Sequence, residues 1–165
     1  MLTAANFVFP LDGGAVDGFF SGHGLQALKL RDATAAAPVL LHSALNRRWG
    51  RLLYTLLENY FAGMAVSFHD IPLDLAAGTV FQQAVWRAAA TTIPHGAHAT
   101  YGELARRIGK PGAARAVGTA LGANPVSIVV PCHRVLAANN RLGGFSSGLH
   151  WKRRLLHLEH IPFSE

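Results

Sequence analysis

The spacing of apolar residues changes along this chain, and that change limits the fold more than any other feature of the sequence. Within residues 6–30, three short apolar segments are separated by two glycine-containing turns, a spacing that predicts a small antiparallel meander. From Pro38 to Gly63 the apolar residues follow a helical period. This period predicts a helix that begins near Pro38, with Gly50 as a candidate break.

Periodicity is lost between Ile71 and Thr79, a segment that contains a proline and a glycine. We therefore expect two domains, residues 1–77 and residues 78–165. After this boundary the apolar spacing predicts helices over 80–90, 100–108, 113–121 and 151–160. The expected fold class is α+β: a small N-terminal domain of antiparallel sheet and helix, followed by a mostly helical C-terminal domain.

Two of the predicted helices form a helix-turn-helix pattern. Thr100 and Glu103 have the spacing of a capping box, which marks the start of the first helix. The turn 109–112 contains two glycines and leads into the second helix, as in DNA-binding units and in other helical hairpins. This second helix carries small side chains and one long polar residue, Arg115. Such a helix either packs closely against a neighbour or enters a narrow groove.

The positive charge of the chain lies in its second half. Residues 1–80 carry five basic and six acidic side chains, a net of −1, whereas residues 81–165 carry ten basic and three acidic ones, a net of +7. A basic half beside a nearly neutral half favours contact with a polyanion. A soluble protein with a high isoelectric point is the alternative interpretation.

The chain contains one cysteine, so it forms no internal disulfide and suits a reducing cytoplasm. We expect a cytoplasmic protein, because no secretory signal or membrane-spanning stretch is recognisable in the sequence. Zinc sites built from several cysteines are excluded. We expect neither a metal nor another cofactor.

That cysteine, Cys132, follows the apolar segment 127–131, which is predicted to be a short strand ending at Pro131. A cysteine beside a buried strand is commonly a core residue. However, His133 and Arg134 place positive charge next to the sulfur, which would favour the thiolate. His133 is also the nearest candidate base for a nucleophilic cysteine, acting through a bridging water.

A base of this kind requires a group that orients it, and the basic half offers three glutamates. Glu103 is assigned to the helix cap, and Glu165 is the last residue of the sequence. Glu159, on the predicted helix 151–160, is therefore the candidate partner of His133. A solvated glutamate on a helix surface is the simpler interpretation of the same residue.

Residues 131–135, Pro-Cys-His-Arg-Val, resemble the active-site motif of the O6-alkylguanine-DNA alkyltransferases, also called methylated-DNA–protein-cysteine methyltransferases. The resemblance covers residues 78–160, whereas the first 77 residues match only by length and by the order of strands and helix. Further segments also stand at family positions: Phe81-Gln82, Val85-Trp86, Ile93-Pro94 with Gly96, Tyr101-Gly102, 114–118, Asn124-Pro125, 143–145, Lys152 and Leu155-Leu156.

The resemblance implies a catalytic role for five residues. Cys132 would accept the alkyl group from O6-alkylguanine in double-stranded DNA, and each molecule would act once. His133 would take the thiol proton through a water, and Glu159 would hold the imidazole. Asn124 would brace the turn before the active site, and Tyr101 would donate to the guanine ring.

The resemblance also implies how a monomer would hold DNA. The helix-turn-helix would be winged-helix-like and would carry the cysteine, and Arg115 would fill the gap left by a flipped nucleotide. Ala114, Gly118 and Thr100 would lie at the DNA surface, with the small-residue helix in the minor groove.

The substrate pocket would hold the flipped base. The carbonyls of Cys132 and Val135 would read the exocyclic amine, and Ser146 would lie beside the alkylated oxygen in a loop with Gly143 and Phe145.

The sequence departs from the family pattern at three points. Residue 145 is Phe where many relatives have Tyr, and residue 147 is Ser where Gly is frequent, which puts acceptance of bulky alkyl groups in doubt. Some relatives build a zinc site in the first domain partly from cysteines, which this chain lacks there.

Three other functions are compatible with parts of the pattern. A helix-turn-helix regulator would bind DNA with Cys132 as a structural residue. A cysteine hydrolase or acyltransferase would turn over, but would have no use for a basic DNA-facing half. A lesion-sensing protein would bind alkylated DNA without transfer.

Overall fold

The computed structural model describes residues 6–32 and 44–165, which form two compact units. The first unit extends to Leu75 and also includes the short segment Pro125–Ser127. The second unit comprises Ala76–Asn124 and Ile128–Glu165. The chain therefore leaves the second unit for three residues immediately before the segment that contains Cys132.

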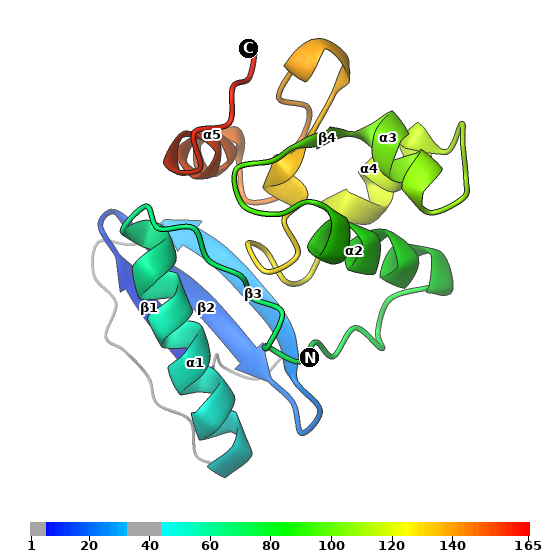
Figure 1. Cartoon of the computed structure of the whole chain (residues 1–165). Helices are drawn as coiled ribbons and strands as arrows, with labels where there is room; N and C mark the ends of the chain where they lie inside the picture. Colours follow the sequence, from blue (N-terminus) through cyan, green and yellow to red (C-terminus); the bar gives the residue numbers. More distant parts are fainter. Residues whose placement is uncertain (1–5, 33–43) are drawn as a thin grey trace. The chain divides into compact units, whose positions relative to one another are not determined.

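The first unit contains the predicted meander, which the structure confirms. Its strands β1 (Phe7–Leu11), β2 (Gly14–Phe20) and β3 (Leu25–Asp32) are antiparallel and pair in sequence order (Figure 1). Gly13 adopts a φ of 73° in the turn between β1 and β2, a conformation that tight hairpins require. The segment 125–127 joins this unit through β3, because Leu28 donates to the carbonyl of Pro125 and accepts from Ser127.

Helix α1 (Ala44–Phe61) packs along this sheet through aromatic contacts. The tyrosine ring of Tyr54 meets the ring of Phe9 edge-on at 4.8 Å. The predicted break at Gly50 is wrong, because the helix continues through this residue. One glycine costs a helix about 1 kcal/mol, and burial of residues such as Leu53 and Leu57 outweighs that cost. The expected start at Pro38 lies outside the described residues.

The second unit contains four α-helices at nearly the predicted positions: α2 (Val80–Thr92), α3 (Tyr101–Arg107), α4 (Ala114–Gly122) and α5 (Leu149–Leu158). The capping box of Thr100 and Glu103 at the start of α3 is confirmed. Helix α2 begins with a second capping box, from Thr79 and Gln82, which the sequence analysis missed. Trp86 of α2 donates from Nε1 to the carbonyl of Ala120 in α4 at 2.8 Å, which fixes α2 against α4.

Helices α3 and α4 flank the predicted turn and form the expected helix-turn-helix. Gly109 and Gly112 adopt φ values of 69° and 90°, which explains the glycines in this turn. Two short strands of the second unit, β4 (Ala99–Thr100) and β5 (Val135–Leu136), pair in parallel. Their pairing joins the start of α3 to the residues that follow Cys132.

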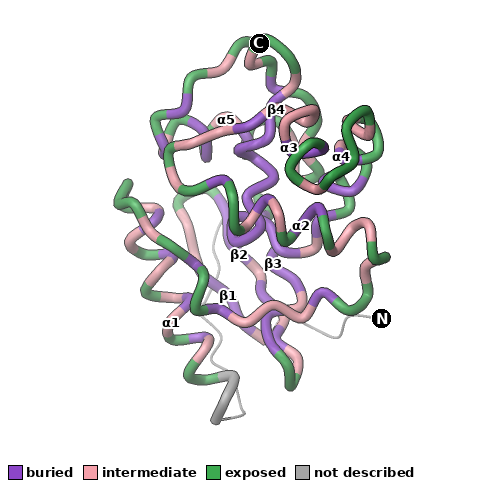
Figure 2. Tube along the Cα trace, turned by 45° about the vertical axis from the view of Figure 1, so that its right-hand side comes forward, coloured by how far each residue is buried: buried purple, intermediate pink, exposed green. Residues whose placement is uncertain are grey.

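The predicted strand over 127–131 is not formed. Ser127 pairs with Leu28, and the next residue, Ile128, takes a φ of 72°. A branched residue rarely adopts this conformation, so the surrounding pairing must impose it. The apolar pattern correctly predicted burial, since Val126 and Ile128–Val130 are buried. Figure 2, coloured by burial, shows that the strands β1, β2 and β3 also contain buried stretches. The apolar pattern could not distinguish a buried turn from a buried strand.

Among the described helices, none is both long enough and apolar enough to cross a membrane.

Candidate active site

Cys132 begins a single 3₁₀ turn, Cys132–Arg134, rather than following a strand. The residue is buried, with 6% of its surface exposed. Its amide donates to the carbonyl of Val130 at 2.8 Å, which folds the backbone tightly at Pro131. Asn124 holds this bend from outside: its Nδ2 donates to the Val130 carbonyl at 2.9 Å and to the Cys132 sulfur at 3.1 Å. Asn124 thus fixes both the turn and the direction of the thiol.

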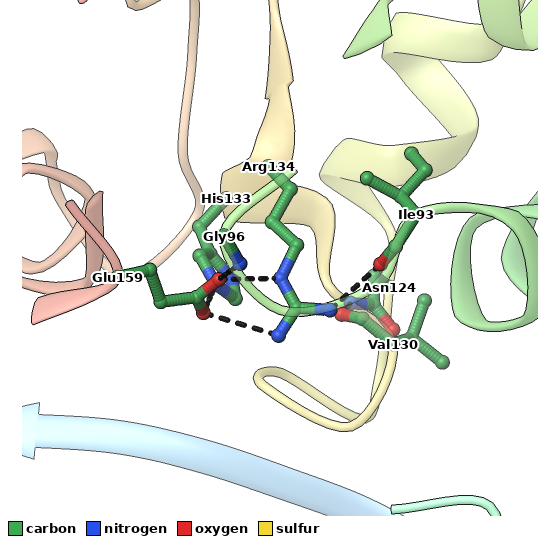
Figure 3. A network of polar contacts seen from close by, with 7 residues as sticks. All are labelled: Ile93, Gly96, Asn124, Val130, His133, Arg134 and Glu159. Atoms are coloured by element: carbon green, nitrogen blue, oxygen red, sulfur yellow. Dashed lines mark hydrogen bonds and ion pairs between the residues drawn. The ribbon is translucent and has the colours of Figure 1, made fainter. Parts of the chain in front are cut away.

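A buried network of polar contacts surrounds the next two residues of the turn (Figure 3). His133 Nε2 lies 2.7 Å from Glu159 Oε1. Arg134 binds the same carboxylate twice, from Nε at 2.8 Å and from Nη2 at 3.1 Å. The amide of Gly96 donates to Glu159 Oε2 at 3.1 Å, and Arg134 Nη1 donates to the carbonyl of Ile93 at 2.7 Å. The network joins the ends of α2 and α5 to the cysteine turn.

The carboxylate at the centre of this network is ionised and the imidazole is neutral. Burial would raise the pKa of Glu159, but the hydrogen bonds and charges of His133 and Arg134 outweigh it and hold the pKa well below its ordinary value. Burial lowers the pKa of His133, although the contact with Glu159 acts in the opposite direction. Because a carboxylate only accepts, Nε2 carries the imidazole hydrogen, and Nδ1 is the basic nitrogen.

The predicted source of positive charge at the sulfur is wrong. Arg134 is engaged by Glu159, and His133 is neutral, so neither supplies a free cation to the thiol. Burial raises the pKa of Cys132, while the hydrogen bond from Asn124 and the charge of Lys152 act in the opposite direction. A resting thiol therefore predominates over a thiolate at neutral pH.

Lys152 stands at a family position, but the sequence analysis gave it no role. It lies on α5, is fully buried, and donates from Nζ to the carbonyls of Val135, Leu142 and Gly144. One signal in the sequence could have found it: Lys152 shares a helix face with Leu155 and Leu156, which are both buried. A lysine in the apolar stripe of a helix needs polar partners.

A pocket of about 450 Å³ opens beside Cys132 within the second unit. Its walls include Tyr101 of α3, residues of α4, and the loop residues Phe145 and Ser146. Burial raises the pKa of the Tyr101 hydroxyl, and its repulsion by a Cys132 thiolate acts in the same direction. A neutral tyrosine hydroxyl thus faces the pocket as a hydrogen-bond donor.

The predicted DNA-contacting residues lie at this pocket or near it. Ala114, Arg115 and Gly118 of α4 line the pocket, and Arg115 is exposed. Thr100 is instead the N-cap of α3, where its hydroxyl contacts the Glu103 carboxylate at 2.9 Å. Its side chain is thus already engaged in local structure.

Of the predicted substrate-binding residues, some line the pocket and others do not. Phe145 and Ser146 line the pocket, and Ser146 is exposed. Val135 is buried, and its carbonyl accepts from Lys152 at 2.8 Å. Gly143 lies against Tyr101: a Cβ at this glycine would stand 2.7 Å from the tyrosine oxygen. Gly144, to which the sequence analysis gave no role of its own, lines the pocket together with Phe145.

Across the described residues, His, Cys, Asp and Glu side chains nowhere gather in threes or more as a metal site would need.

Comparison with known proteins agrees with this geometry. Residues 80–161 match the family model described as the DNA-binding domain of 6-O-methylguanine DNA methyltransferase. A methylated-DNA–protein-cysteine methyltransferase of Mycobacterium tuberculosis is 55% identical over 103 residues, which are 62% of this chain and 61% of that protein. The chain thus matches less than two thirds of the length of that relative. The same-named protein of Methanosarcina mazei is 48% identical over 69% of this chain and 70% of its own length.

The solved structures extend the likeness to both units. The crystal structure of Mycobacterium tuberculosis OGT in complex with DNA has a TM-score of 0.76 and 41% identity, over 92% of this chain and 90% of that chain. A structure of the O6-methylguanine methyltransferase of the same organism has a TM-score of 0.72 and 40% identity, with the same coverage. The chain therefore belongs to the family of the methylated-DNA–protein-cysteine methyltransferases.

Proposed function

We propose that this protein repairs DNA by moving the alkyl group of O6-alkylguanine onto Cys132, once per molecule. One observation carries the proposal: the sulfur of Cys132 borders a pocket, receives a hydrogen bond from Asn124, and precedes a histidine held by a buried glutamate. A nucleophilic cysteine with an oriented base beside it is suited to group transfer. The names of the related proteins state methyl transfer from methylated DNA to a protein cysteine.

The reaction begins with removal of the thiol proton. Because burial favours the thiol form of Cys132, a base must take this proton as the reaction proceeds. Nδ1 of His133 accepts it through a bridging water, and the ionised Glu159 stabilises the imidazolium that results. Glu159 and Asn124 are thus set to hold the base and the sulfur in fixed directions.

Transfer is then one in-line displacement. The bond from Cys132 sulfur to the alkyl carbon forms while the bond from that carbon to O6 of guanine breaks. The electron pair of the broken bond stays on the guanine, and the Tyr101 hydroxyl donates to the ring to reduce the charge of this leaving group. The product is a thioether, which water does not cleave, so the protein is consumed in the reaction.

The C-terminal domain expected from the sequence, residues 78–165, is proposed to bind double-stranded DNA and to carry the acceptor cysteine. The alkyl carbon is inside the base stack of a duplex, so the nucleotide must rotate out, at a cost of roughly a few kcal/mol. Arg115, exposed at the pocket rim on α4, would fill the vacated space. Ala114 and Gly118 would let this helix approach the minor groove, and the net charge of +7 in this half supports contact with phosphates.

The pocket is proposed to hold the flipped alkylguanine. The carbonyls of Cys132 and Val135 would accept from its exocyclic amine, Ser146 would lie near the alkylated oxygen, and Phe145 and Gly143 would shape the loop around it. We further propose that the protein acts as a monomer in the cytoplasm, with the first unit as a support.

Intact-protein mass spectrometry tests this function directly. The protein is mixed with a duplex that contains one O6-methylguanine, and peptide mapping follows. We expect a gain of one methyl group on Cys132, at one equivalent and no more, and no gain in a Cys132→Ser control. No gain in mass while the lesion duplex stays bound would indicate a sensor. Neither gain nor lesion preference would indicate a DNA-binding regulator.

A further inference from the structure

One buried tryptophan, Trp86 of α2, takes no part in the reaction described above. The residue is 3% exposed, and its indole N–H donates to the carbonyl of Ala120 in α4 at 2.8 Å. The backbone of Gly78 lies against the same ring, because a Cβ at Gly78 would collide with it. A phenylalanine would fill much of this space without offering a donor. The N–H of Trp86 therefore calls for an explanation of its own.

The carbonyl that accepts from Trp86 belongs to the last turn of α4, which its own hydrogen bonds hold loosely. The amide of Ala123 is shared between two carbonyls at 3.2 Å each, one of them that of Ala120. The amide of Asn124 bonds the carbonyl of Leu121 at 3.1 Å, in the tighter three-residue pattern. Helix ends tighten in this way because their last carbonyls lack regular partners. The indole of Trp86 adds a hydrogen bond to this end from another helix.

The same end of α4 leads directly to the reactive sulfur. Leu121 and Gly122 line the pocket beside Cys132. Asn124 follows two residues after Gly122, is buried, and donates from Nδ2 to the Cys132 sulfur at 3.1 Å. Only four positions separate Ala120 from Asn124. A shift of the helix end is therefore passed to the side-chain amide that touches the sulfur.

We propose that Trp86 is a positioning residue: its indole N–H fixes the C-terminal end of α4 and, through Asn124, the direction of the Cys132 sulfur. A tryptophan that served packing alone would have no need of its N–H. The inference deepens the proposed function and rests on it, because the sulfur in question is the proposed acceptor of the alkyl group. It concerns the end of α4 next to that sulfur, whereas Arg115 stands at the start of the helix.

Trp86→Phe keeps an aromatic ring in the core and removes the indole N–H. Single-turnover transfer at increasing concentrations of a duplex with one O6-methylguanine separates duplex affinity from the rate constant of transfer. We expect the rate constant to fall about fivefold, as loss of one neutral hydrogen bond would cause, and the affinity to change less. Trp49→Phe makes the same change in α1, where the ring stacks with Phe20, and should transfer at the original rate. An unchanged rate constant in a folded Trp86→Phe protein would overturn the proposal.

Asn124→Ala tests whether Trp86 acts through Asn124. Removal of the side-chain amide disconnects the sulfur from the end of α4, so Trp86→Phe should slow transfer no further in the Asn124→Ala protein. A tryptophan that only stabilises the fold would slow transfer by the same factor with and without the amide. That additive result would also overturn the proposal.

NMR of the original protein decides the question where a variant fails to fold. The indole signal of Trp86, one of three tryptophans, is assigned from its proximity to the protons of Ala120. Iodoacetamide alkylates Cys132, the single cysteine, without any DNA. The added group displaces the amide of Asn124 from the sulfur. Because coupling between two sites is reciprocal, we expect the Trp86 signal to shift while that of Trp49 stays. A Trp86 signal that does not move would overturn the proposal.

The NMR measurement also separates this inference from the proposed function. If no methyl group reaches Cys132 from the duplex but the Trp86 signal shifts on alkylation by iodoacetamide, the proposed function fails and Trp86 retains its role at the sulfur. If methyl transfer succeeds and the Trp86 signal does not move, only the inference about Trp86 fails.

Discussion

At the scale of single residues, two opposing effects act on the pKa of the Cys132 thiol. Burial favours the neutral thiol of Cys132, whereas Asn124 and Lys152 favour the thiolate. A thiol in this balance does not ionise freely, which limits wasteful reaction with other electrophiles. It requires a base at the moment of transfer, and His133 can serve only if its ring is held with Nδ1 available as the acceptor.

The role of Glu159 follows from this requirement. Glu159→Gln keeps the shape of the side chain but removes the charge that stabilises a protonated His133. We expect the rate of methyl transfer to fall at least about tenfold, with binding of lesion-containing duplex retained. Single-turnover mass spectrometry and a binding titration measure the two effects separately.

Glu165→Gln is the matched control, because Glu165 is an exposed partner of Arg153. It should transfer at the original rate. An unchanged transfer rate in Glu159→Gln would remove Glu159 from the mechanism.

At the scale of elements, two glycines allow backbone segments to lie close to the ring of Tyr101 beside the pocket. Gly118 of α4 approaches the Tyr101 ring, where a Cβ would lie 3.7 Å from a ring carbon. Gly143 approaches it more closely and has a φ of 65°. The helix-turn-helix and the loop after β5 therefore both contact the same tyrosine. A Cβ at Gly143 would crowd the Tyr101 hydroxyl that faces the pocket, whereas one at Gly118 would make only ordinary van der Waals contact with the ring.

Gly143→Ala tests this arrangement. The new methyl group would lie 2.7 Å from the tyrosine oxygen, in a backbone conformation that alanine disfavours. We expect a loss of at least about 1 kcal/mol in the free energy of unfolding, together with slower transfer. Gly22→Ala is the control, since a Cβ there would meet nothing within 4 Å and the residue does not line the pocket. Chemical denaturation and transfer rates should be unchanged in the control, and equal losses in both variants would contradict the steric explanation.

A second prediction at this scale concerns Arg115 of helix α4. Arg115→Ala should keep the fold, because the side chain is exposed, and should slow transfer from duplex DNA far more than transfer from free O6-alkylguanine. Only the duplex requires a filled gap after base flipping. Arg87→Ala removes an exposed charge from α2 and should show no such selectivity. Equal losses on the two substrates would exclude the flipping role of Arg115.

Much of this arrangement could be predicted from sequence, because the helices begin and end at local signals. The capping box at Thr100 and the glycines of the turn fixed the helix-turn-helix within one or two residues. The short apolar segment before Cys132 was misassigned, since its φ at Ile128 depends on pairing with β3, far away in the sequence. The sequence analysis placed Lys152 at a family position but did not predict its contacts, for a related reason. Its carbonyl partners carry no side-chain signature, so only the folded backbone reveals them.

At the scale of the whole molecule, the buried ionisable groups make stability depend on pH. Burial lowers the pKa of His133 below its ordinary value of 6.5, so the unfolded chain takes up that proton first as pH falls. The pKa of Glu159 lies well below 4.5 in the folded protein. The stability that this carboxylate contributes is therefore present above pH 4.5 and is lost as pH falls through its folded pKa. Both groups make the folded protein less stable in acid.

Thermal unfolding measured from neutral pH to about pH 3 checks this dependence. We expect the melting temperature to fall first below about pH 6.5 and then more steeply below about pH 4.5. Glu159→Gln should flatten the second part of the curve, whereas Glu165→Gln should leave it as it was. If the melting temperature of Glu159→Gln falls as steeply below about pH 4.5 as that of the original protein, the loss of stability comes from other carboxylates.

The segment Pro125–Ser127 has a consequence for the order in which the protein acquires its structure during synthesis. Strand β3 is synthesised well before this segment, so the hydrogen bonds of Leu28 to Pro125 and Ser127 can form only after the later segment has emerged from the ribosome. Cys132 follows five residues after Ser127, and Asn124, which donates a hydrogen bond to its sulfur, directly precedes Pro125. The first unit is therefore complete only after the segment next to Cys132 in the sequence has been synthesised.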